Sequence, residues 1–325
     1  MAMHIHRIPF KAMACACEVV LAVDSAVDSA TGSADEAAAL AQHGIDEVLR
    51  IERTYSRYLD DSIVARINAA AGGEAVLCDA ETWALLEYAD QLHRASDGLF
   101  DITSGVLRRA WNFKQPRVPD ADELAALRAL IAWPSVERHD MRVRLPQRGM
   151  EIDFGGFGKE YAADRAGALL AARGVRHGYV NLGGDMRVLG PKPDGTPWLI
   201  GIQHPRKVNA LIATLPVQQG GLATSGDYER FFELDGARYC HVLDPRSGMP
   251  VTHWRSVSVL APLAVVAGNC TTMAMLKGPA GLAWLQASGM DFLAIDQQGH
   301  VHTRDTVVPA ALADEADATL TAQGA

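Results

Sequence analysis

Hydrophobic and polar positions change their period within residues 150–164, which is the most distinctive local pattern of the chain. Apolar residues first alternate with acidic ones, as on a half-buried strand, at Met150, Ile152 and Phe154. Three glycines follow, and Gly155, Gly156 and Gly158 allow positive φ angles and a close approach of a ligand. The next residues favour a helix that ends before Gly174. Such a turn suits a phosphate, while a turn without a ligand fits the local pattern equally well.

Two common phosphate-binding motifs are excluded at this turn. A P-loop requires Gly-Lys followed by Ser or Thr, whereas Lys159 is followed by Glu160, and no glycine stands five residues before Gly158. A dinucleotide-binding fingerprint requires Gly or Ala where this chain has Tyr161. Neither motif therefore accounts for the glycines.

The same periodicities predict the remaining elements. Helical spacing of apolar residues predicts helices over 34–57, 62–68, 79–96, 106–110, 121–130, 267–278 and 282–288. Alternation predicts strands within 1–24, 136–145, 179–189, 198–203, 211–217, 238–250, 256–260 and 292–295. Asp61 or Ser62 can cap the second helix, and 25–33 has the composition of a loop. The paired glycines at 183–184 indicate a bulge within one strand or a close approach of a ligand.

The order of these elements favours one fold class. Helices cluster early and strands are paired by tight turns, which favours an α+β fold with mixed or antiparallel sheets flanked by helices over a doubly wound sheet. With 325 residues and 49% hydrophobic content, the chain can bury a large core. We interpret residues 1–302 as a single two-lobed domain and expect the Ala-, Asp- and Thr-rich tail 303–325 to be mobile.

Charge and hydropathy restrict the partners. A formal net charge of −9 and a pI near 5.6 argue against a nucleic-acid groove or an anionic membrane surface as the main partner. The best apolar run, 12–23, is interrupted by Glu18 and is too short to span a bilayer. Arg7 and Lys11 precede it, but it also has the pattern of a strand and no clear cleavage site follows. We therefore expect a cytoplasmic protein, or a periplasmic one if an export signal has been removed.

The five cysteines do not describe a disulfide framework, because their number is odd and their spacing is unpaired. Cys15 and Cys17 could chelate a metal, but no second Cys or His pair lies nearby. Buried thiols are the favoured interpretation.

Several polar groups are candidates for chemistry, each with a structural alternative. His241 could act as a general base oriented by Asp244, although a single histidine in a strand is more often structural. The hydroxyls at 224–225 could donate to phosphate oxygens or cap a turn. Those at 271–272 could bind Mg²⁺ or bond back to their own helix.

The order of the candidate blocks is more specific than any block alone. The blocks are Met13; Tyr58 with Ser62 and Asn68; 97–101; 153–159; 181–185; 224–228; 241–248; and Thr272. In this combination the chain resembles the FAD:protein FMN transferases, the ApbE family, over about residues 5–295.

The resemblance implies an α+β fold that holds FAD in a cleft, with Mg²⁺ on the pyrophosphate. It also implies transfer of FMN from FAD to a Thr or Ser hydroxyl of an acceptor protein, with release of AMP. The positions that match flavin-nucleotide contacts are Met13, Tyr58, Leu99, Phe100, Asp101, Asp153, Lys159 and Val242. His241 matches the base, and Thr272 with a backbone carbonyl at Gly156 matches the metal ligands.

The chain departs from the family pattern at two positions. Gly268 stands where the family usually has an aspartate four residues before the metal-binding threonine, and Glu160 stands where a glycine tends to follow the lysine. Loss of a carboxylate should weaken a Mg²⁺ site, so Gly268→Asp is expected to tighten the Mg²⁺ dependence. Many members are exported lipoproteins, so the absent export signal predicts a cytoplasmic variant or a trimmed chain.

Two alternatives to the transferase remain open at this point. One is a flavin-binding or storage module that has lost catalysis together with the aspartate. The other is an FAD pyrophosphatase that releases FMN and AMP to water.

Overall fold

The computed structural model describes residues 3–24, 30–304 and 307–308. Its strands are β1 (Met3–Ala12), β2 (Cys15–Asp24), β3 (Val76–Leu77), β4 (Glu137–His139), β5 (Arg142–Arg144), β6 (Gly178–Leu182), β7 (Asp185–Gly190), β8 (Trp198–Gln203), β9 (Leu211–Val217), β10 (Gly220–Gly226), β11 (Phe231–Leu234), β12 (Ala237–Cys240), β13 (Trp254–Ala261), β14 (Asp291–Asp296), β15 (Val301–Thr303) and β16 (Val307–Val308). Its α-helices are α1 (Ala30–Tyr55), α2 (Ile63–Ala69), α3 (Ala80–Ala95), α4 (Ala121–Arg128), α5 (Gly158–Ala172), α6 (Ala264–Lys277) and α7 (Gly281–Ser288), and its 3₁₀ helices are η1 (Ile102–Arg109), η2 (Trp133–Ser135) and η3 (Gly278–Ala280).

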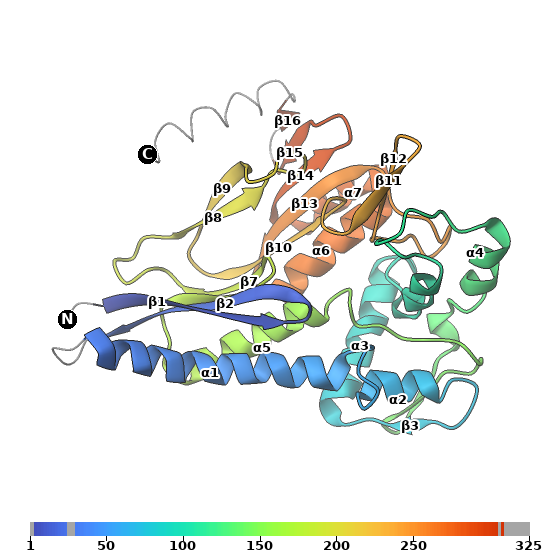
Figure 1. Cartoon of the computed structure of the whole chain (residues 1–325), viewed down its shortest axis with the longest axis horizontal. Coiled ribbons are helices and arrows are strands. Elements are labelled where there is room, and N and C mark those ends of the chain that lie inside the picture. The colour runs from blue at the N-terminus through green and yellow to red at the C-terminus, as the bar shows by residue number, and fades with distance from the viewer. Residues whose placement is uncertain (1–2, 25–29, 305–306, 309–325) are drawn as a thin grey trace.

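One large antiparallel sheet organises these elements. Within the described residues it has nine strands in the order β1-β2-β6-β7-β10-β13-β14-β15-β16, and each neighbouring pair is antiparallel. Smaller antiparallel sheets pair β11 with β12, β8 with β9, and β5 with both β3 and β4. Figure 1 shows the helices beside this sheet, which confirms the predicted α+β fold.

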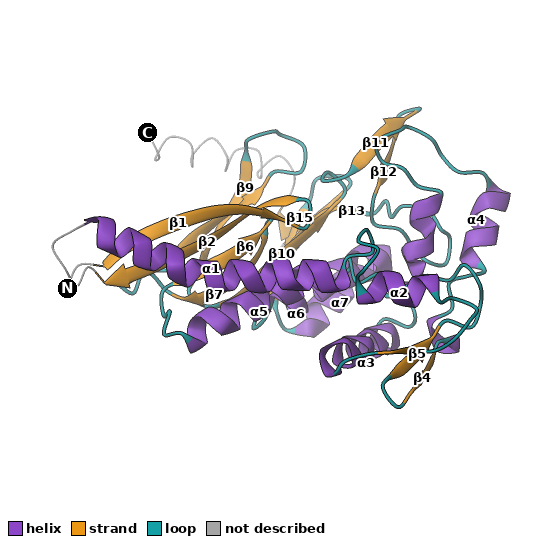
Figure 2. Cartoon of the chain, turned by 60° about the horizontal axis from the view of Figure 1, so that its bottom comes forward, coloured by secondary structure: helices purple, strands orange, loops and turns teal. Residues whose placement is uncertain are grey.

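The two faces of the sheet bury different partners. In β2, Val19 and Leu21 join the core beneath the helices, while Val20 joins a second core with Trp198 and Ile202 of β8. The two-residue period of the strand thus sends alternate side chains to opposite faces. Helices α1, α5 and α6 lie along one face, and α5 packs against both α1 and α6 (Figure 2). The sheet is therefore sandwiched between these helices and the β8–β9 hairpin.

The strand predicted at 150–154 is wrong. Its apolar residues are buried as the alternation required, but no neighbouring strand pairs with it. The side chain of Asn68 instead donates to the Ile152 carbonyl and accepts from the Ile152 N–H, and the Asp153 N–H donates to the carbonyl of Ile102. Alternation reveals the buried face of a segment, but it cannot reveal that a side chain satisfies the backbone in place of a strand.

None of the three glycines within 155–158 adopts the positive φ angle that glycine allows. Gly156 is required for space instead, because a Cβ there would lie 2.9 Å from Cζ of Phe100. Helix α5 ends before Gly174, as predicted, and Gly174 has a φ of 89°.

The glycines at 183–184 form neither a bulge nor the interior of one strand. Gly183 and Gly184 have φ of 61° and 98°, and Leu182 pairs with Asp185 on either side of them. Two consecutive positive φ angles are typical of the tight turns that join antiparallel strands. The predicted strand 179–189 is therefore a hairpin.

Several element boundaries also differ from the prediction. Helix α1 begins at Ala30, so the predicted loop is wrong at 30–33, while 25–29 lie outside the described residues. The strand at 292–295 is not the last, because β15 and β16 extend the sheet beyond it. Most of the predicted tail 303–325 lies outside the described residues.

Two predictions from composition can be compared with the described chain. None of its helices combines the length and apolar character needed to cross a membrane. All five cysteines carry free thiols, four of them buried, and Cys15 and Cys17 lie with their sulfurs 3.5 Å apart.

Candidate active site

A cavity of about 1630 Å³ lies beside the large sheet and is lined by residues from many parts of the chain. Its volume exceeds the 300–1,000 Å³ that is usual for a small-molecule pocket, so it has room for a dinucleotide. The lining includes all of the predicted site residues: Met13, Tyr58, Leu99, Phe100, Asp101, Asp153, Gly156, Lys159, His241, Val242 and Thr272. The fold thus brings these separated residues together.

Met13 reaches the cavity on a tight hairpin turn between β1 and β2. Met13 and Ala14 have φ of 51° and 58°, a conformation that non-glycine residues adopt only at a cost. The Met13 N–H donates to Oε1 of Glu52 at 2.7 Å, so α1 holds the turn in place.

Tyr58 offers an accessible ring at the cavity. Its side chain is 76% exposed, and the guanidinium of Arg57 lies 5.9 Å from the ring centroid. An exposed aromatic ring that lines a cavity can stack on a planar ligand.

The segment at 99–101 combines an apolar wall with a structural carboxylate. Leu99 and Phe100 are buried, and the Phe100 ring fills the space that a side chain at Gly156 would need. Asp101 caps η1, since its Oδ1 accepts from the N–H of Thr103 at 2.7 Å and from the hydroxyl of that residue at 2.5 Å. The Asp101 carboxylate is therefore already used by the fold.

Asp153 lies between two arginines at the cavity wall. Its Oδ2 is 3.3 Å from Arg57 and 3.4 Å from Arg108, while Oδ1 accepts from the Gly155 N–H at 2.8 Å. These contacts place two guanidinium groups beside the glycine turn. Positive charge there is suited to an anionic ligand.

Lys159, in the first turn of α5, forms an ion pair at the cavity wall, with Nζ 2.6 Å from Oδ2 of Asp185. Burial opposes the charge of Lys159, but attraction to Asp185 and to Glu160 raises its pKa above the usual range. Asp185 is buried and its Oδ1 also accepts from the Thr224 N–H at 3.4 Å. Lys159 is therefore a fixed cation whose charge is partly neutralised.

A group of hydroxyls faces the cavity where β10 meets α6. Oγ of Ser225 is 2.8 Å from Oγ1 of Thr271 and 3.5 Å from Oγ1 of Thr272, and the Thr271 hydroxyl donates to the carbonyl of Gly268. Thr271 thus bonds back to its own helix, whereas Thr272 lines the cavity. Ser225 lies in a strand, so the alternative role as a turn cap is wrong.

The described residues contain no group of three or more His, Cys, Asp or Glu side chains placed to hold a metal ion. A cation in this cavity would therefore be held by hydroxyl and carbonyl oxygens of the protein, by at most isolated carboxylates, and by oxygens of a bound ligand. Such an all-oxygen set is preferred by Mg²⁺ and not by Zn²⁺.

His241 is largely buried at the cavity, and its Nδ1 has no hydrogen-bond partner within the described chain. Burial, together with repulsion from Arg230 and Arg108, lowers the pKa of His241 to about 3. The ring is therefore neutral at pH 7 and can accept a proton.

The predicted pairing of His241 with Asp244 is not found. Asp244 bonds to Arg246 instead, accepting from its N–H at 2.8 Å and from its guanidinium at 3.0 Å. A spacing of three residues along an extended segment does not bring side chains together, because successive side chains point to opposite sides. Asp244 therefore does not orient the His241 ring.

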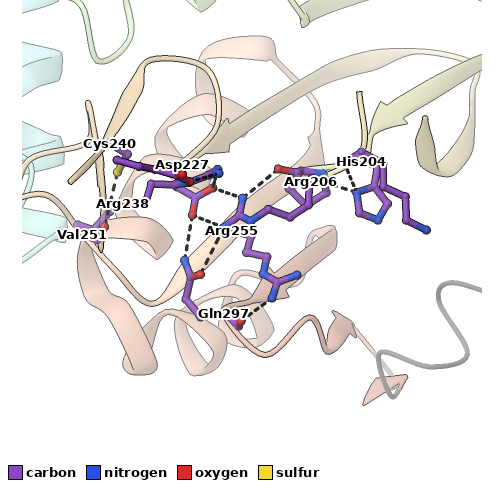
Figure 3. A network of polar contacts seen from close by, with 11 residues as sticks. His204, Arg206, Asp227, Arg238, Cys240, Val251, Arg255 and Gln297 are labelled. Atoms are coloured by element: carbon purple, nitrogen blue, oxygen red, sulfur yellow. Dashed lines mark hydrogen bonds and ion pairs between the residues drawn. The ribbon is translucent and has the colours of Figure 1, made fainter. Parts of the chain in front are cut away.

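A buried carboxylate anchors the wall that follows β10 (Figure 3). Asp227 accepts from Arg206 at 2.6 and 2.7 Å and from the amide of Gln297 at 3.0 Å, and Arg238 lies 3.6 Å away. The network ties the turn after β8 to the segment that carries Tyr228, which lines the cavity.

Sequence reasoning did not assign roles to several of these groups, namely Arg57, Arg108, Asp185, Asp227 and Arg230. Asp185 and Asp227 stood inside quoted blocks, and each carboxylate follows a glycine next to an apolar segment. A carboxylate at such a place in the sequence could have been predicted to be buried and to form an ion pair, as both do. The arginines carried no such signal, because exposed arginines are common.

Comparisons with known proteins agree with this geometry. The family model described as the ApbE family matches residues 13–294. Relatives named FAD:protein FMN transferase, from Klebsiella pneumoniae and Treponema pallidum, are 32% and 34% identical over 272 and 249 residues, covering 78% and 70% of this chain and 74% and 68% of theirs. The crystal structure of the ApbE protein from Thermotoga maritima matches with a TM-score of 0.83 and 29% identity over 93% of this chain and 97% of that one. On the extent of these matches in sequence and fold, the chain belongs to the ApbE family.

Proposed function

We propose that this protein transfers FMN from FAD to a Thr or Ser hydroxyl of an acceptor protein and releases AMP. The observation that carries the proposal is the single cavity in which all of the predicted site residues meet. The names of the relatives from Klebsiella pneumoniae and Treponema pallidum support the same reaction.

The cavity has the groups that FAD binding requires. The exposed ring of Tyr58 offers a stacking surface, and Leu99 and Phe100 form an apolar wall. Arg57 and Arg108 beside the glycine turn, together with Lys159, supply positive charge for the pyrophosphate. These cations are local, since the whole chain carries a net charge of −9.

The oxygen donors at the junction of β10 and α6 fit a hard divalent cation, and Mg²⁺ is the ion that we propose. Thr272 and the backbone carbonyl of Gly156, both in the cavity lining, would hold it. When bound, such an ion neutralises charge on the pyrophosphate and on the AMP leaving group.

The transfer itself exchanges a phosphoanhydride bond of FAD for a phosphoester bond to the acceptor. The acceptor hydroxyl oxygen forms a bond to the phosphorus of the FMN moiety, and the bond from that phosphorus to the bridging oxygen breaks, so that AMP leaves with the bond pair. The hydroxyl proton passes to the imidazole of His241, which lines the cavity and is neutral at pH 7. The negative charge of bound FAD would offset the repulsion from Arg230 and Arg108 and make the ring more basic.

Incubation of the protein with FAD, Mg²⁺ and an acceptor peptide tests the proposal. We expect in-gel flavin fluorescence on the peptide and one equivalent of AMP for each transfer. AMP without a labelled peptide would select the pyrophosphatase instead, and FAD binding with neither product would select the storage module.

A further inference from the structure

Glu160 is a buried carboxyl group in the cavity to which the proposed reaction assigns no role. It follows Lys159 on α5, lines the cavity and is only 8% exposed. Its Oε2 is buried and has no hydrogen-bond partner within the described chain. A buried carboxylate oxygen without a partner is costly, so a group from outside the polypeptide is expected to complete it.

The nearest protein cation does not fill this role. Nζ of Lys159 bonds to Asp185 at 2.6 Å, which leaves Glu160 without an ion pair among the described residues. Asp185 and Glu160 therefore share one ammonium group, and burial together with repulsion from Asp185 raises the pKa of Glu160 to about 8. A cation bound from solution would stabilise the charged form of Glu160.

The contact between Glu160 and Gly268 indicates where that cation would lie. A Cβ on residue 268 would be 2.7 Å from Cγ of Glu160 and 2.8 Å from its Cδ, and closer still to Oε1. The carboxyl group of Glu160 thus occupies the space that a side chain at 268 would enter. Helices α5 and α6, which carry the two residues, pack side by side (Figure 2).

Thr272 lies one helical turn beyond Gly268. Residues four apart on a helix share a face, so the Glu160 carboxylate and the Thr272 hydroxyl meet the cavity along the same side of α6. Oγ of Ser225 lies 3.5 Å from the Thr272 hydroxyl and adds another oxygen. Carboxylate and hydroxyl oxygens around a polar cavity are the donors that a hard divalent cation takes.

We propose that Glu160 is a ligand of the divalent cation in this cavity, supplying from α5 the carboxylate that Gly268 cannot supply from α6. The inference rests on the proposed function, because the cation it binds is the one that serves the FAD pyrophosphate. It explains the two departures from the family pattern as one exchange: the carboxylate has moved to position 160, and glycine at 268 makes room for it.

The exchange corrects the expectation for Gly268→Asp. An aspartate there would collide with the Glu160 carboxyl group and bring a second negative charge against it. The single substitution should therefore weaken the cation site or leave it unimproved, and the aspartate should support binding only when position 160 is glycine.

Titration with Mn²⁺, followed by electron paramagnetic resonance of the free ion, tests the proposal on the full chain. Mn²⁺ takes the oxygen ligands that suit Mg²⁺. Glu160→Gln keeps the shape of the side chain and should weaken Mn²⁺ binding at least tenfold. The double variant Glu160→Gly with Gly268→Asp should restore the affinity to within about threefold of the original chain, which a merely structural role of Glu160 would not produce.

Glu229→Gln is the matched control, because Glu229 lines the same cavity but is exposed. The Mn²⁺ affinity of this variant should equal that of the original chain. Thermal unfolding of each variant establishes that it is folded. Unchanged Mn²⁺ affinity in folded Glu160→Gln would overturn the inference, even if flavin transfer were lost, since Glu160 would then act as an acid and not as a ligand. A Glu160-dependent Mn²⁺ site in a chain that transfers no flavin would uphold the inference and overturn the proposed function.

Discussion

Replacement of Asp227 by asparagine should lower the free energy of unfolding by about 3 kcal/mol. The Asp227 side chain is 4% exposed and holds Arg206 through two hydrogen bonds of 2.6 and 2.7 Å (Figure 3). Asparagine removes the charge and turns an N–H₂ group toward the guanidinium or toward Gln297, both of which donate to Asp227 here.

The magnitude follows from what the substitution leaves behind. Loss of one partner of a buried ion pair costs about 3–5 kcal/mol, because the other charge remains without compensation. The Arg206 side chain is 25% exposed, so water can solvate part of the released charge. We therefore take the lower end of the range.

Equilibrium denaturation by urea, monitored by fluorescence and circular dichroism, measures the change. Asp194→Asn is the control, because that carboxylate lies in an exposed turn and accepts from Thr196 through an oxygen that asparagine retains. Its stability should stay close to that of the original chain.

A double-mutant cycle with Arg206→Met isolates the stranded guanidinium. The double variant should be more stable than the sum of the single losses predicts, with a coupling of at least about 1.5 kcal/mol. A loss below about 1 kcal/mol for Asp227→Asn, or strict additivity with Arg206→Met, would refute the reasoning.

Three further predictions concern the cavity. His241→Ala should reduce flavin transfer by about 10²–10⁴-fold while FAD still quenches the protein fluorescence, and undiminished turnover would exclude His241 as the base. Burial and two arginines lower the pKa of His241 to about 3 from 6.5, so the unfolded chain binds a proton at this residue before the folded chain does as the pH falls. The free energy of unfolding should therefore decrease from pH 6.5 toward 3 more steeply than in His241→Gln, with a difference of about 2 kcal/mol at pH 5. Parallel pH profiles of the two proteins in urea denaturation would contradict this. Gly156→Ala should lower the free energy of unfolding by about 1–3 kcal/mol, because the new Cβ would lie 2.9 Å from the ring of Phe100. Adding Phe100→Leu to Gly156→Ala should recover most of that loss. Equal stability of Gly156→Ala and the original chain in urea would show that the turn can shift.

Periodicity predicted a helix well where a single face is buried, as along α3. It failed at 150–154, where the side chain of Asn68, more than 80 positions away, takes the place of a strand. It also failed at 183–184, since paired glycines suit a bulge and a hairpin turn alike and only the pairing of Leu182 with Asp185 decides between them.

The candidate site was predicted as a set of positions but not as a set of contacts. The matched blocks named residues that line the cavity, because their order along the chain is specific. Contacts such as Lys159 with Asp185, or Asp153 with Arg108, depend on how distant segments pack, and no local pattern encodes them. Glu160 and Gly268 were visible only as separate departures, since their proximity arises from the packing of α5 on α6.

The distribution of the cavity lining along the chain makes ligand binding a measure of folding as a whole. Met13 lies in the first hairpin and Thr272 in the last long helix, and most of the other lining residues lie between them in the sequence. A ligand that contacts all of these segments can bind only when the β1–β2 hairpin, the glycine turn and α6 are docked at the same time. FAD should therefore raise the midpoint of thermal unfolding in proportion to the logarithm of its concentration, and neither half of the chain alone should retain it.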